Sequence, residues 1–488
     1  MLLVHPVIEV GKALPAILGA FLAGHGSGSG SRWSLGIAAV VVAFALLRWV
    51  TTRYRITTEQ IQLRHGLLRR RTLTAPTDRV RTVDVTSHLL HRVLGLARVA
   101  IGTGTSDRKG RNRLLLDGLT APAADALRSE LLHREEPTGQ LDAAVLIQDE
   151  VQDHSTEHEL ARVDSAWLRY APFTLTGAVA GLALLGLLWR VVNEGRVNLR
   201  SIKAYRVVAD QLQRWPLGWD ILVVLVAVLI FIALASTVGY VLSFWHFRLT
   251  RHRGGTLHVS RGLLTARATS IERRRLLGAE LSEPLLLRSV GGARCLAIAT
   301  GLRVGRGAER GGEILLPPAP RAEAVRVAST VVESPTPFTV ELSRHPVAAR
   351  RRRITRALSV AVVIGLLLCV IVWLAAWPDW LLYLTLLPIL MGVPLGLDRY
   401  RSLGHALVDG FVVTRFGSIV RRRCAIQSNG VIGWNIRSSF FQRRLGLSTL
   451  VATTAAGRQK YEIGDVAPAE AIGFADAALP GVLTQFLA

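Results

Sequence analysis

The chain has 488 residues, half of them hydrophobic, with a formal net charge of +24 and a mean hydropathy of +0.34. This composition is too apolar for an ordinary soluble protein and predicts several membrane helices. The charge comes from 55 arginines and 4 lysines spread along the chain, not from the single basic stripe typical of nucleic-acid binding, so we exclude nucleic acid as a partner. Three scattered cysteines, Cys295, Cys369 and Cys424, exclude a disulfide framework.

Residues 1–50 are expected to form a first transmembrane hairpin. Its spans are residues 10–24 and WSLGIAAVVVAFALLRWV (33–50), joined by GHGSGSGS. A helix needs about 20 apolar residues to cross a hydrocarbon core of about 30 Å, so the first span is short and the second is nearly complete. Basic residues directly after the hairpin predict that the following segment faces the cytoplasm.

Residues 51–135 are expected to fold as a small β-barrel-like module capped by a C-terminal helix. YRITTEQIQLRHG (54–66) and RVRTVDVTS (79–87) alternate apolar and polar residues, as strands do. HLLHRVLG then predicts a helical turn that plugs one end of the sheet, and LARVAIGTG and LLLDGL predict a strand hairpin. Pro122 marks the start of the last helix, where a residue without an N–H is tolerated.

An acidic polar linker, residues 136–166, is expected to lead into a second hairpin at 167–245. Its spans are 167–189 and 219–245, and the intervening outer loop, 190–216, has the apolar spacing of a short amphipathic surface helix. That loop is rich in basic residues, which is unusual for an outer loop. We still place it outside, because the flanks on the other side of the membrane carry more positive charge in total.

The remaining chain repeats this plan. A second module is expected at 246–333, a basic linker at 334–356, a third hairpin at 357–397 and a third module at 398–485. The third hairpin has spans at 357–377 and 380–397, of which the second is weakened by two prolines. Six spans in three hairpins place an even number of crossings before every module, which predicts a multi-pass cell-membrane protein whose N-terminus and three modules all face the cytoplasm.

A repeated spacing of glycines supports three copies of one unit. Each copy has a first glycine and, 29 residues later, a second glycine that ends the helical plug, with an arginine three residues before the second. We interpret the arginine as structural, bridging the plug to a neighbouring carbonyl or carboxylate. The three sets are Gly66, Arg92 and Gly95; Gly262, Arg288 and Gly291; and Gly417, Arg443 and Gly446.

These phrases resemble a known family. YRITTEQIQLRHGLLRRR, RVRTVDVTSHLLHRVLGLARVAI and VIGWNIRSSFFQRRLGLSTL are similar to the bacterial pleckstrin-homology-like (PH-like) domain, also called DUF304 or bPH2, in particular to the YdbT-like membrane proteins with three copies. The resemblance implies two roughly orthogonal antiparallel sheets with a C-terminal helix, and no assigned reaction. The chain departs from the pattern in its third copy, where Gly430 stands in place of the arginine found at 79 and 275.

Two kinds of basic segment are candidate binding sites for anionic lipid or a protein partner. One kind is a run of consecutive arginines on a predicted strand. The other is a glycine-containing hairpin tip, whose backbone N–H groups and arginines could bind phosphate. The alternatives are charged strand edges that resist pairing and ordinary solvated turns, and both stay open. The candidates are Arg69, Arg70, Arg71, Arg108, Lys109, Arg111, Arg113, Arg421, Arg422 and Arg423.

No catalytic motif, metal site or cofactor site is predicted, so the chain is expected not to be an enzyme. The favoured function is a membrane scaffold or accessory protein whose modules bind a protein partner or the membrane surface, in envelope homeostasis or toxic-peptide export. Anionic lipid is the expected weak ligand, and a membrane protein, for which a smaller single-module homologue is one candidate, is the expected partner. The alternative is a transporter component or a membrane enzyme acting with a partner subunit.

Overall fold

The computed structural model describes most of the chain after residue 52. The described residues are 53–57, 60–65, 71–76, 82–88, 92, 95–102, 114–132, 158–194, 217–252, 255–301, 313–375, 378, 382–383 and 386–481. They form two compact units, which we describe separately. The first hairpin, the hairpin tip at 106–113 and most of the outer loop 190–216 lie outside the described residues.

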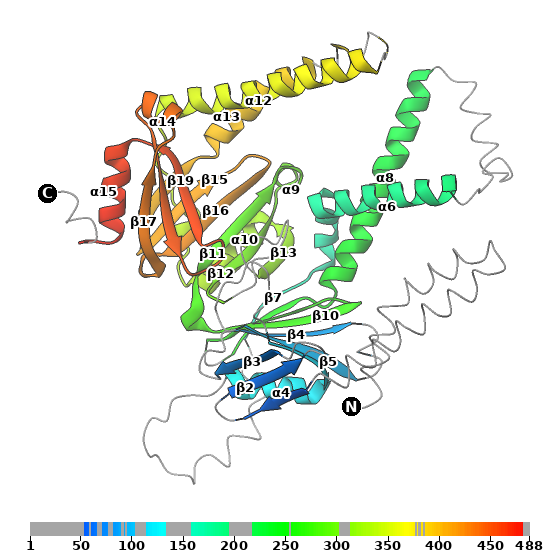
Figure 1. Cartoon of the computed structure of the whole chain (residues 1–488), viewed down its shortest axis with the longest axis vertical. Helices are drawn as coiled ribbons and strands as arrows, with labels where there is room; N and C mark the ends of the chain where they lie inside the picture. Colours follow the sequence, from blue (N-terminus) through cyan, green and yellow to red (C-terminus); the bar gives the residue numbers. More distant parts are fainter. Residues whose placement is uncertain are drawn as a thin grey trace. The chain divides into compact units, whose positions relative to one another are not determined.

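The first unit contains a small sheet and a large one, both antiparallel (Figure 1). The small sheet has the order β1-β2-β3, and the large one has the order β6-β5-β4-β10-β9-β8-β7. Helix α4 (Ala121–Leu132) packs on the large sheet around a core that includes Val83, Val99, Ile101 and Leu116. The strands are β1 (Arg53–Ile56), β2 (Gln60–His65), β3 (Arg71–Pro76), β4 (Thr82–His88), β5 (Leu96–Gly102), β6 (Leu114–Thr120), β7 (His158–Arg162), β8 (Arg248–Arg251), β9 (Leu257–Arg261) and β10 (Thr265–Ile271), and the 3₁₀ turn η4 (Arg273–Arg275) follows β10.

The second unit contains a six-stranded sheet with the order β13-β12-β11-β16-β15-β14. Strand β12 is buried along its whole length, and the central strands β11 and β16 carry charged residues beside their apolar ones. Helix α10 (Arg321–Val332) packs on this sheet with the buried face Ala324, Val327, Ala328 and Val331. The strands and short helices are β11 (Leu276–Pro284), α9 (Leu285–Ser289), β12 (Gly292–Ala299), β13 (Ile314–Pro320), α11 (Thr336–Thr339), β14 (Gly404–Val408), β15 (Phe411–Phe416), β16 (Val420–Gln427) and the 3₁₀ turn η7 (Ser428–Gly430).

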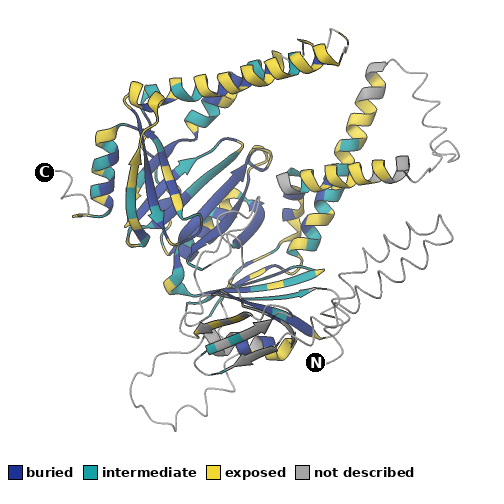
Figure 2. Cartoon of the chain, in the orientation of Figure 1, coloured by how far each residue is buried: buried dark blue, intermediate teal, exposed yellow. Residues whose placement is uncertain are grey.

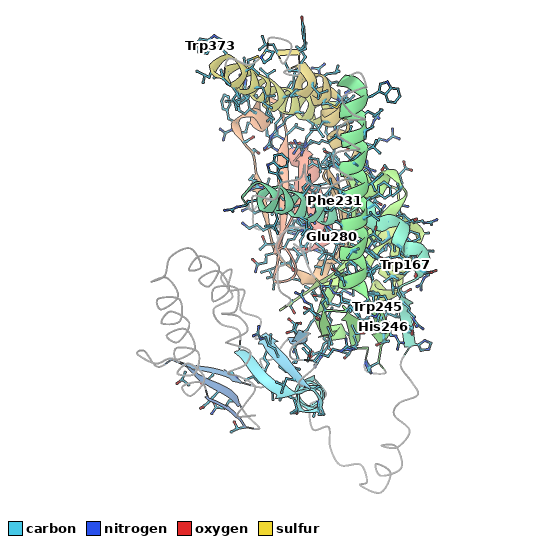
Figure 3. All side chains as sticks on the ribbon, turned by 90° about the vertical axis from the view of Figure 1, so that its right-hand side faces the viewer. Trp167, Phe231, Trp245, His246, Glu280 and Trp373 are labelled. Atoms are coloured by element: carbon cyan, nitrogen blue, oxygen red, sulfur yellow. The ribbon has the colours of Figure 1, made fainter. Side chains whose placement is uncertain are left out.

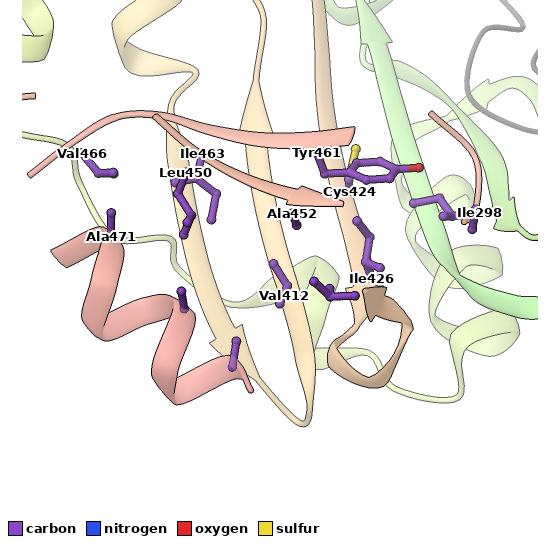
Figure 4. Close-up of a cluster of buried hydrophobic side chains, with 14 residues drawn as sticks. Ile298, Val412, Cys424, Ile426, Leu450, Ala452, Tyr461, Ile463, Val466 and Ala471 are labelled. Atoms are coloured by element: carbon purple, nitrogen blue, oxygen red, sulfur yellow. The ribbon is translucent and has the colours of Figure 1, made fainter. Parts of the chain in front are cut away.

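The C-terminal part of this unit is a three-stranded sheet in the order β17-β18-β19. Its strands are β17 (Val431–Arg437), β18 (Ser448–Thr454) and β19 (Lys460–Val466), with α14 (Phe440–Arg444) after β17 and α15 (Pro468–Ala478) at the end. Figure 4 shows the core between these elements and strands β15 and β16, with the Tyr461 ring beside Cys424 and Ile298. Because these side chains are almost fully buried, this core is the main apolar contribution to the fold here.

Two described helices are long and apolar enough to cross a membrane, α8 (Leu217–Phe244) and α12 (Val347–Leu374). A third candidate is a broken pair, the 3₁₀ helix η2 (Ser165–Phe173) and α6 (Leu175–Glu194), bent by 65°. Figure 2 shows their surfaces largely exposed, as expected for helices whose apolar faces meet lipid and not protein. In Figure 3 Phe231 lies part-way along α8, and Trp373 lies near the end of α12, the aromatic residue expected at a membrane interface.

Two expected spans differ in the structure. The span expected at 167–189 begins at Leu175, because Trp167, Tyr170 and Ala171 in η2 are buried against protein. The span expected at 380–397 is α13 (Leu386–Arg401), a helix of 16 residues with a proline inside it, which pairs with α12. Two of the described helices are therefore candidate membrane spans by length and composition, which is compatible with a membrane protein.

Several strand expectations also need correction. Residues 54–66 are two strands, because Thr57 and Gln60 form a tight turn between β1 and β2. The end of the expected linker 136–166 is strand β7, which pairs with β8. The expected modules were self-contained, but β10 pairs with β4 and β16 pairs with β11, so both large sheets cross the expected module boundaries.

The signature glycines occupy backbone conformations that side chains disfavour. Gly95, Gly291 and Gly446 have φ of +66°, +71° and +62°, and a Cβ on any of them would meet open space. Gly417 has φ +95°, and there a Cβ would lie 2.1 Å from the Val420 carbonyl oxygen. At the second glycine of each copy only the positive φ disfavours a side chain. At Gly417 the positive φ disfavours one, and there is also no room for a Cβ.

Candidate functional site

A buried carboxylate joins the start of the membrane-length helix α12 to the C-terminal sheet. Asp465, at the end of β19, is fully buried and has φ +65°, a conformation that aspartate tolerates better than most residues. Its Oδ1 accepts hydrogen bonds from Arg352 Nη1 and, at 2.9 Å, from Gln442 Nε2, while its Oδ2 accepts from Arg353 Nε at 2.5 Å. The two arginines therefore fasten the helix that enters the membrane to the sheet that follows it.

Gln442 in turn fastens helix α14 to the same carboxylate. Ser439 and Gln442 form a capping box, in which each side chain bonds the backbone N–H of the other residue. Gln442 Nε2 also donates to Thr449 Oγ1 at 2.8 Å. One buried aspartate thus holds three elements, α12, α14 and β19, in one arrangement. We call Asp465, Arg352, Arg353 and Gln442 the helix lock.

Two buried histidines lie beside the helix lock. His345 lies just before α12, and His405 is on β14. His345 Nδ1 lies 3.2 Å from the Asp465 carbonyl oxygen, and His345 Nε2 lies 3.3 Å from His405 Nδ1. His405 Nε2 lies 3.3 Å from Glu470 Oε1. Burial, together with the nearby charge of His405, lowers the pKa of His345 to about 4. Burial also lowers the pKa of His405, against the opposing charge of Glu470. Both rings are therefore built into the fold as neutral groups.

A second buried carboxylate, Glu280, lies where β11 pairs with β16. Glu280 is fully buried, and its Oε1 accepts from Arg422 Nη1 at 2.5 Å while its Oε2 accepts from Arg458 Nε at 3.1 Å. Figure 3 labels Glu280 among the side chains of the second unit. Burial raises the pKa of the Glu280 carboxyl, and the charge of Arg422 opposes that rise. Cys424 Sγ lies 3.7 Å away, and burial raises the pKa of this thiol as well. A thiol held protonated in this way is a poor nucleophile.

The expected basic sites are placed as follows. Arg421 donates to Asp398 and Ser402, Arg422 to Glu280, and Arg423 to the Pro337 and Val340 carbonyl oxygens. Burial, together with the charge of Arg415, lowers the pKa of Arg423 to about 10. The strand is also paired on both sides, so β16 is not an exposed sheet edge. Lipid or partner binding by these three arginines stays a prediction.

The other expected residues are divided between described and undescribed parts. Arg71 lies on β3, while Arg69, Arg70, Arg108, Lys109, Arg111, Arg113 and Gly66 lie outside the described residues. Arg92 Nη1 lies 3.5 Å from the Leu263 carbonyl oxygen, and Arg288 Nη2 bonds Asp398 at 3.1 and 3.2 Å. Arg443 is exposed on α14.

Sequence reasoning missed both buried carboxylates. A signal was present, because Glu280 stands in the otherwise apolar run of β11 and Asp465 directly precedes the last core valine of β19. An acidic residue inside a buried strand predicts a buried partner. The partner cannot be named from sequence, because Arg422 and Arg458 are two of many arginines far along the chain.

These clusters hold parts of the second unit together. Each carboxylate accepts hydrogen bonds from two arginines. Among the described residues no three His, Cys, Asp or Glu side chains gather as a metal site. The second unit is therefore a membrane-associated β-sheet assembly fastened by buried ion pairs.

Comparison with known proteins assigns a family to the N-terminal quarter of the chain. Residues 12–135 match the family model described as the bacterial PH domain. No curated protein and no solved structure matches the chain. The family match covers the expected first hairpin and first module, and it indicates a membrane-associated or binding role.

Proposed function

We propose that this chain is a non-enzymatic, multi-pass membrane scaffold of the YdbT-like kind, carrying three PH-like modules that bind a protein partner or the membrane surface. The second and third modules share one element order: three strands, a strand leading into a short helix, a strand pair and a closing helix. The described strands β1 to β6 and helix α4 of the matched region fit the same order. In this proposal all six spans are present and every module faces the cytoplasm.

The observation that carries the proposal is the short distance between membrane helices and sheets. Helix α8 ends at Phe244 and β8 begins at Arg248, while α13 ends at Arg401 and β14 begins at Gly404. At about 3.5 Å per extended residue, such links keep the first strand within roughly 15 Å of the helix end. A module held so close to the bilayer is positioned to bind lipid head groups or a neighbouring membrane protein.

The helix lock supports a scaffold over a transporter. Buried ion pairs at the base of α12 fix the helix against the sheet, whereas alternating access requires such elements to move. No charged side chain follows Asp220 in α8 or Arg356 in α12, so the described spans offer no ion pathway.

Orientation is tested with single cysteines in a chain whose three native cysteines are replaced by alanine. Lys460→Cys lies on an exposed hairpin of the third module, and Pro378→Cys lies in the exposed turn between α12 and α13. An impermeant thiol reagent applied to intact cells should label Pro378→Cys, and should label Lys460→Cys only after lysis. Labelling of Lys460→Cys in intact cells would overturn the orientation.

Binding is tested with the full-length protein in neutral-lipid nanodiscs presented with anionic or neutral vesicles. Replacing Arg108, Lys109, Arg111 and Arg113 by Gln should weaken capture of anionic vesicles at low salt, because each nearby basic residue contributes about 1 kcal/mol. The control removes the same charge from scattered exposed positions, Arg162, Arg344, Arg401 and Arg444. Equal capture by the parent and both variants would reject lipid binding by the hairpin tip.

A further inference from the structure

Two pairs of strands in this chain are joined in the same way. Strand β10 pairs antiparallel with β4, and β16 pairs antiparallel with β11 (Figure 1). In each case the strand that follows a signature glycine adds to the strand that precedes the helical plug of the preceding copy. We call these two pairings the internal junctions.

The register of the two internal junctions is also identical. Thr265 pairs with His88, and Val420 pairs with Pro284. Thr265 and Val420 each lie three residues after the first glycine of their copy, and His88 and Pro284 each lie seven residues before the second glycine of theirs, Gly95 and Gly291. The two junctions have the same register although their paired side chains differ. The register is therefore a property of the repeated backbone and not of one local contact.

The same pairing pattern leaves one strand of the first copy and one strand of the third copy with a partner on one side only. Among the described strands, β3 pairs only with β2, and β17 pairs only with β18. Strand β3 occupies the place of β10 and β16, and β17 occupies the place of β4 and β11. Among the described strands, one copy of each half of a junction is therefore unused.

The exposure of β17 indicates what is missing. Its counterpart β11, which has its junction partner, is buried at eight of nine positions, whereas β17 is buried only at Val431. Ile432 and Ile436 are 71% and 40% exposed. An edge with unpaired N–H and C=O groups and exposed apolar side chains is a template for another strand.

We propose that β3 of one chain adds to β17 of a second copy of this chain, forming a third junction between molecules. This rests on the proposed three-module organisation. The register of the internal junctions places Thr72 opposite Ile436 and Thr74 opposite Trp434. Pro76, which has no N–H to donate, falls one position beyond the last pair of the β11 and β16 junction.

Charge and symmetry are compatible with this pairing. The register places Arg71 opposite Arg437, but Arg437 already binds Glu462 at 2.5 Å, which reduces the repulsion. The contact is heterologous, since different strands meet from the two copies, so it forms a ring or an open row.

The test uses two differently tagged full-length chains, each with its native cysteines replaced by alanine and each given one cysteine. Thr74→Cys in one tagged chain should form a disulfide with Trp434→Cys in the other under mild oxidation in membranes, several-fold more than with the out-of-register control Ile432→Cys. A second in-register pair, Leu73→Cys with Asn435→Cys, is tested as well. Hydrogen-bonded and non-hydrogen-bonded pairs alternate along antiparallel strands and differ in Cα separation, so one of the two cysteine pairs has the separation that suits a disulfide better.

Three results would overturn the proposal. One is equal cross-linking for in-register and out-of-register pairs. Another is a disulfide only within a single chain that carries both cysteines. A third is a product with one tag and a smaller mass, which would mean that another protein occupies β17. The labelling of Lys460→Cys tests the orientation of the modules independently of the cross-link. If the orientation is as proposed and the cross-link does not form, only the junction between molecules is rejected, and the proposed function stands.

A second variant tests the junction without engineered disulfides. Ile432→Lys combined with Ile436→Lys places charge on the exposed edge, a substitution that blocks strand addition without removing a buried side chain. The variant should lower the mass of the detergent-solubilised protein to that of one chain, with unchanged unfolding temperature. A parent protein that is already a single chain at all concentrations in membranes and in detergent would contradict the proposal.

Discussion

Asp465→Asn is the sharpest test of the helix lock. Asparagine has nearly the same shape and also tolerates positive φ, so the substitution mainly removes the charge. Asp465 is fully buried, and the Arg352 and Arg353 side chains are only 14% and 19% exposed, so solvent screens the pair weakly. Removing one partner of such a buried pair costs about 3 to 5 kcal/mol, because it leaves uncompensated charge behind.

The assay is thermal unfolding of the detergent-solubilised full chain, followed by tryptophan fluorescence. A loss of 3 to 5 kcal/mol corresponds to a fall of roughly 10 °C for a unit of this size. Hydrogen exchange should localise the loss to β18, β19 and the first turns of α12. The matched control is Asp409→Asn, since Asp409 also has positive φ (51°) but is exposed. If the two variants unfold within 1 °C of each other, the buried ion pair does not hold the helix to the sheet.

Three further predictions concern separate parts of the second unit. The pKa of His345 is about 4 in the folded chain and about 6.5 in the unfolded chain, so between these pH values the unfolded chain binds more protons than the folded chain. The free energy of unfolding should therefore rise by up to about 3 kcal/mol from pH 4 to pH 6.5. His345→Asn should flatten this dependence of the unfolding free energy on pH. Gly446→Ala should cost about 1 to 2 kcal/mol from backbone strain alone, and Gly417→Ala should cost more, because its Cβ would lie 2.1 Å from the Val420 carbonyl oxygen; denaturant unfolding compares the two. Tyr240→Phe removes a 2.9 Å hydrogen bond from α8 to a β13 carbonyl and should cost about 1 to 3 kcal/mol in the same assay, and no change would mean that water replaces the bond.

Local features were largely predictable from the sequence. Alternation of apolar and polar residues located most strands. The 29-residue spacing singled out Gly95, Gly291 and Gly446, and the structure places all three at positive φ. Both signals are local, since strand alternation reflects burial of one face and positive φ excludes most side chains. Helix length and apolar composition likewise predicted α8 and α12.

Features that depend on distant partners were not predictable. The sequence gives no sign that β10 adds to β4 and not to a strand of its own copy, because backbone hydrogen bonds are the same for either partner. The run at 421–423 looks like a solvated basic face, yet Glu280, Asp398 and backbone carbonyls far away in sequence bind its arginines. Among 55 arginines, charge alone cannot identify which one meets a given carboxylate.

The sequence by itself predicted apolar segments long enough to span a membrane and a repeated glycine spacing, because hydropathy and the backbone preference of glycine act over short stretches of chain. Only the tertiary structure decided which strands share a sheet, which carboxylates are buried and which arginines neutralise them. Those outcomes depend on desolvation, which is a property of the packed neighbourhood. Asp465 is an ordinary acidic residue in the sequence, and it becomes the anchor of α12 only because folding removes water from it and brings two arginines within hydrogen-bonding distance.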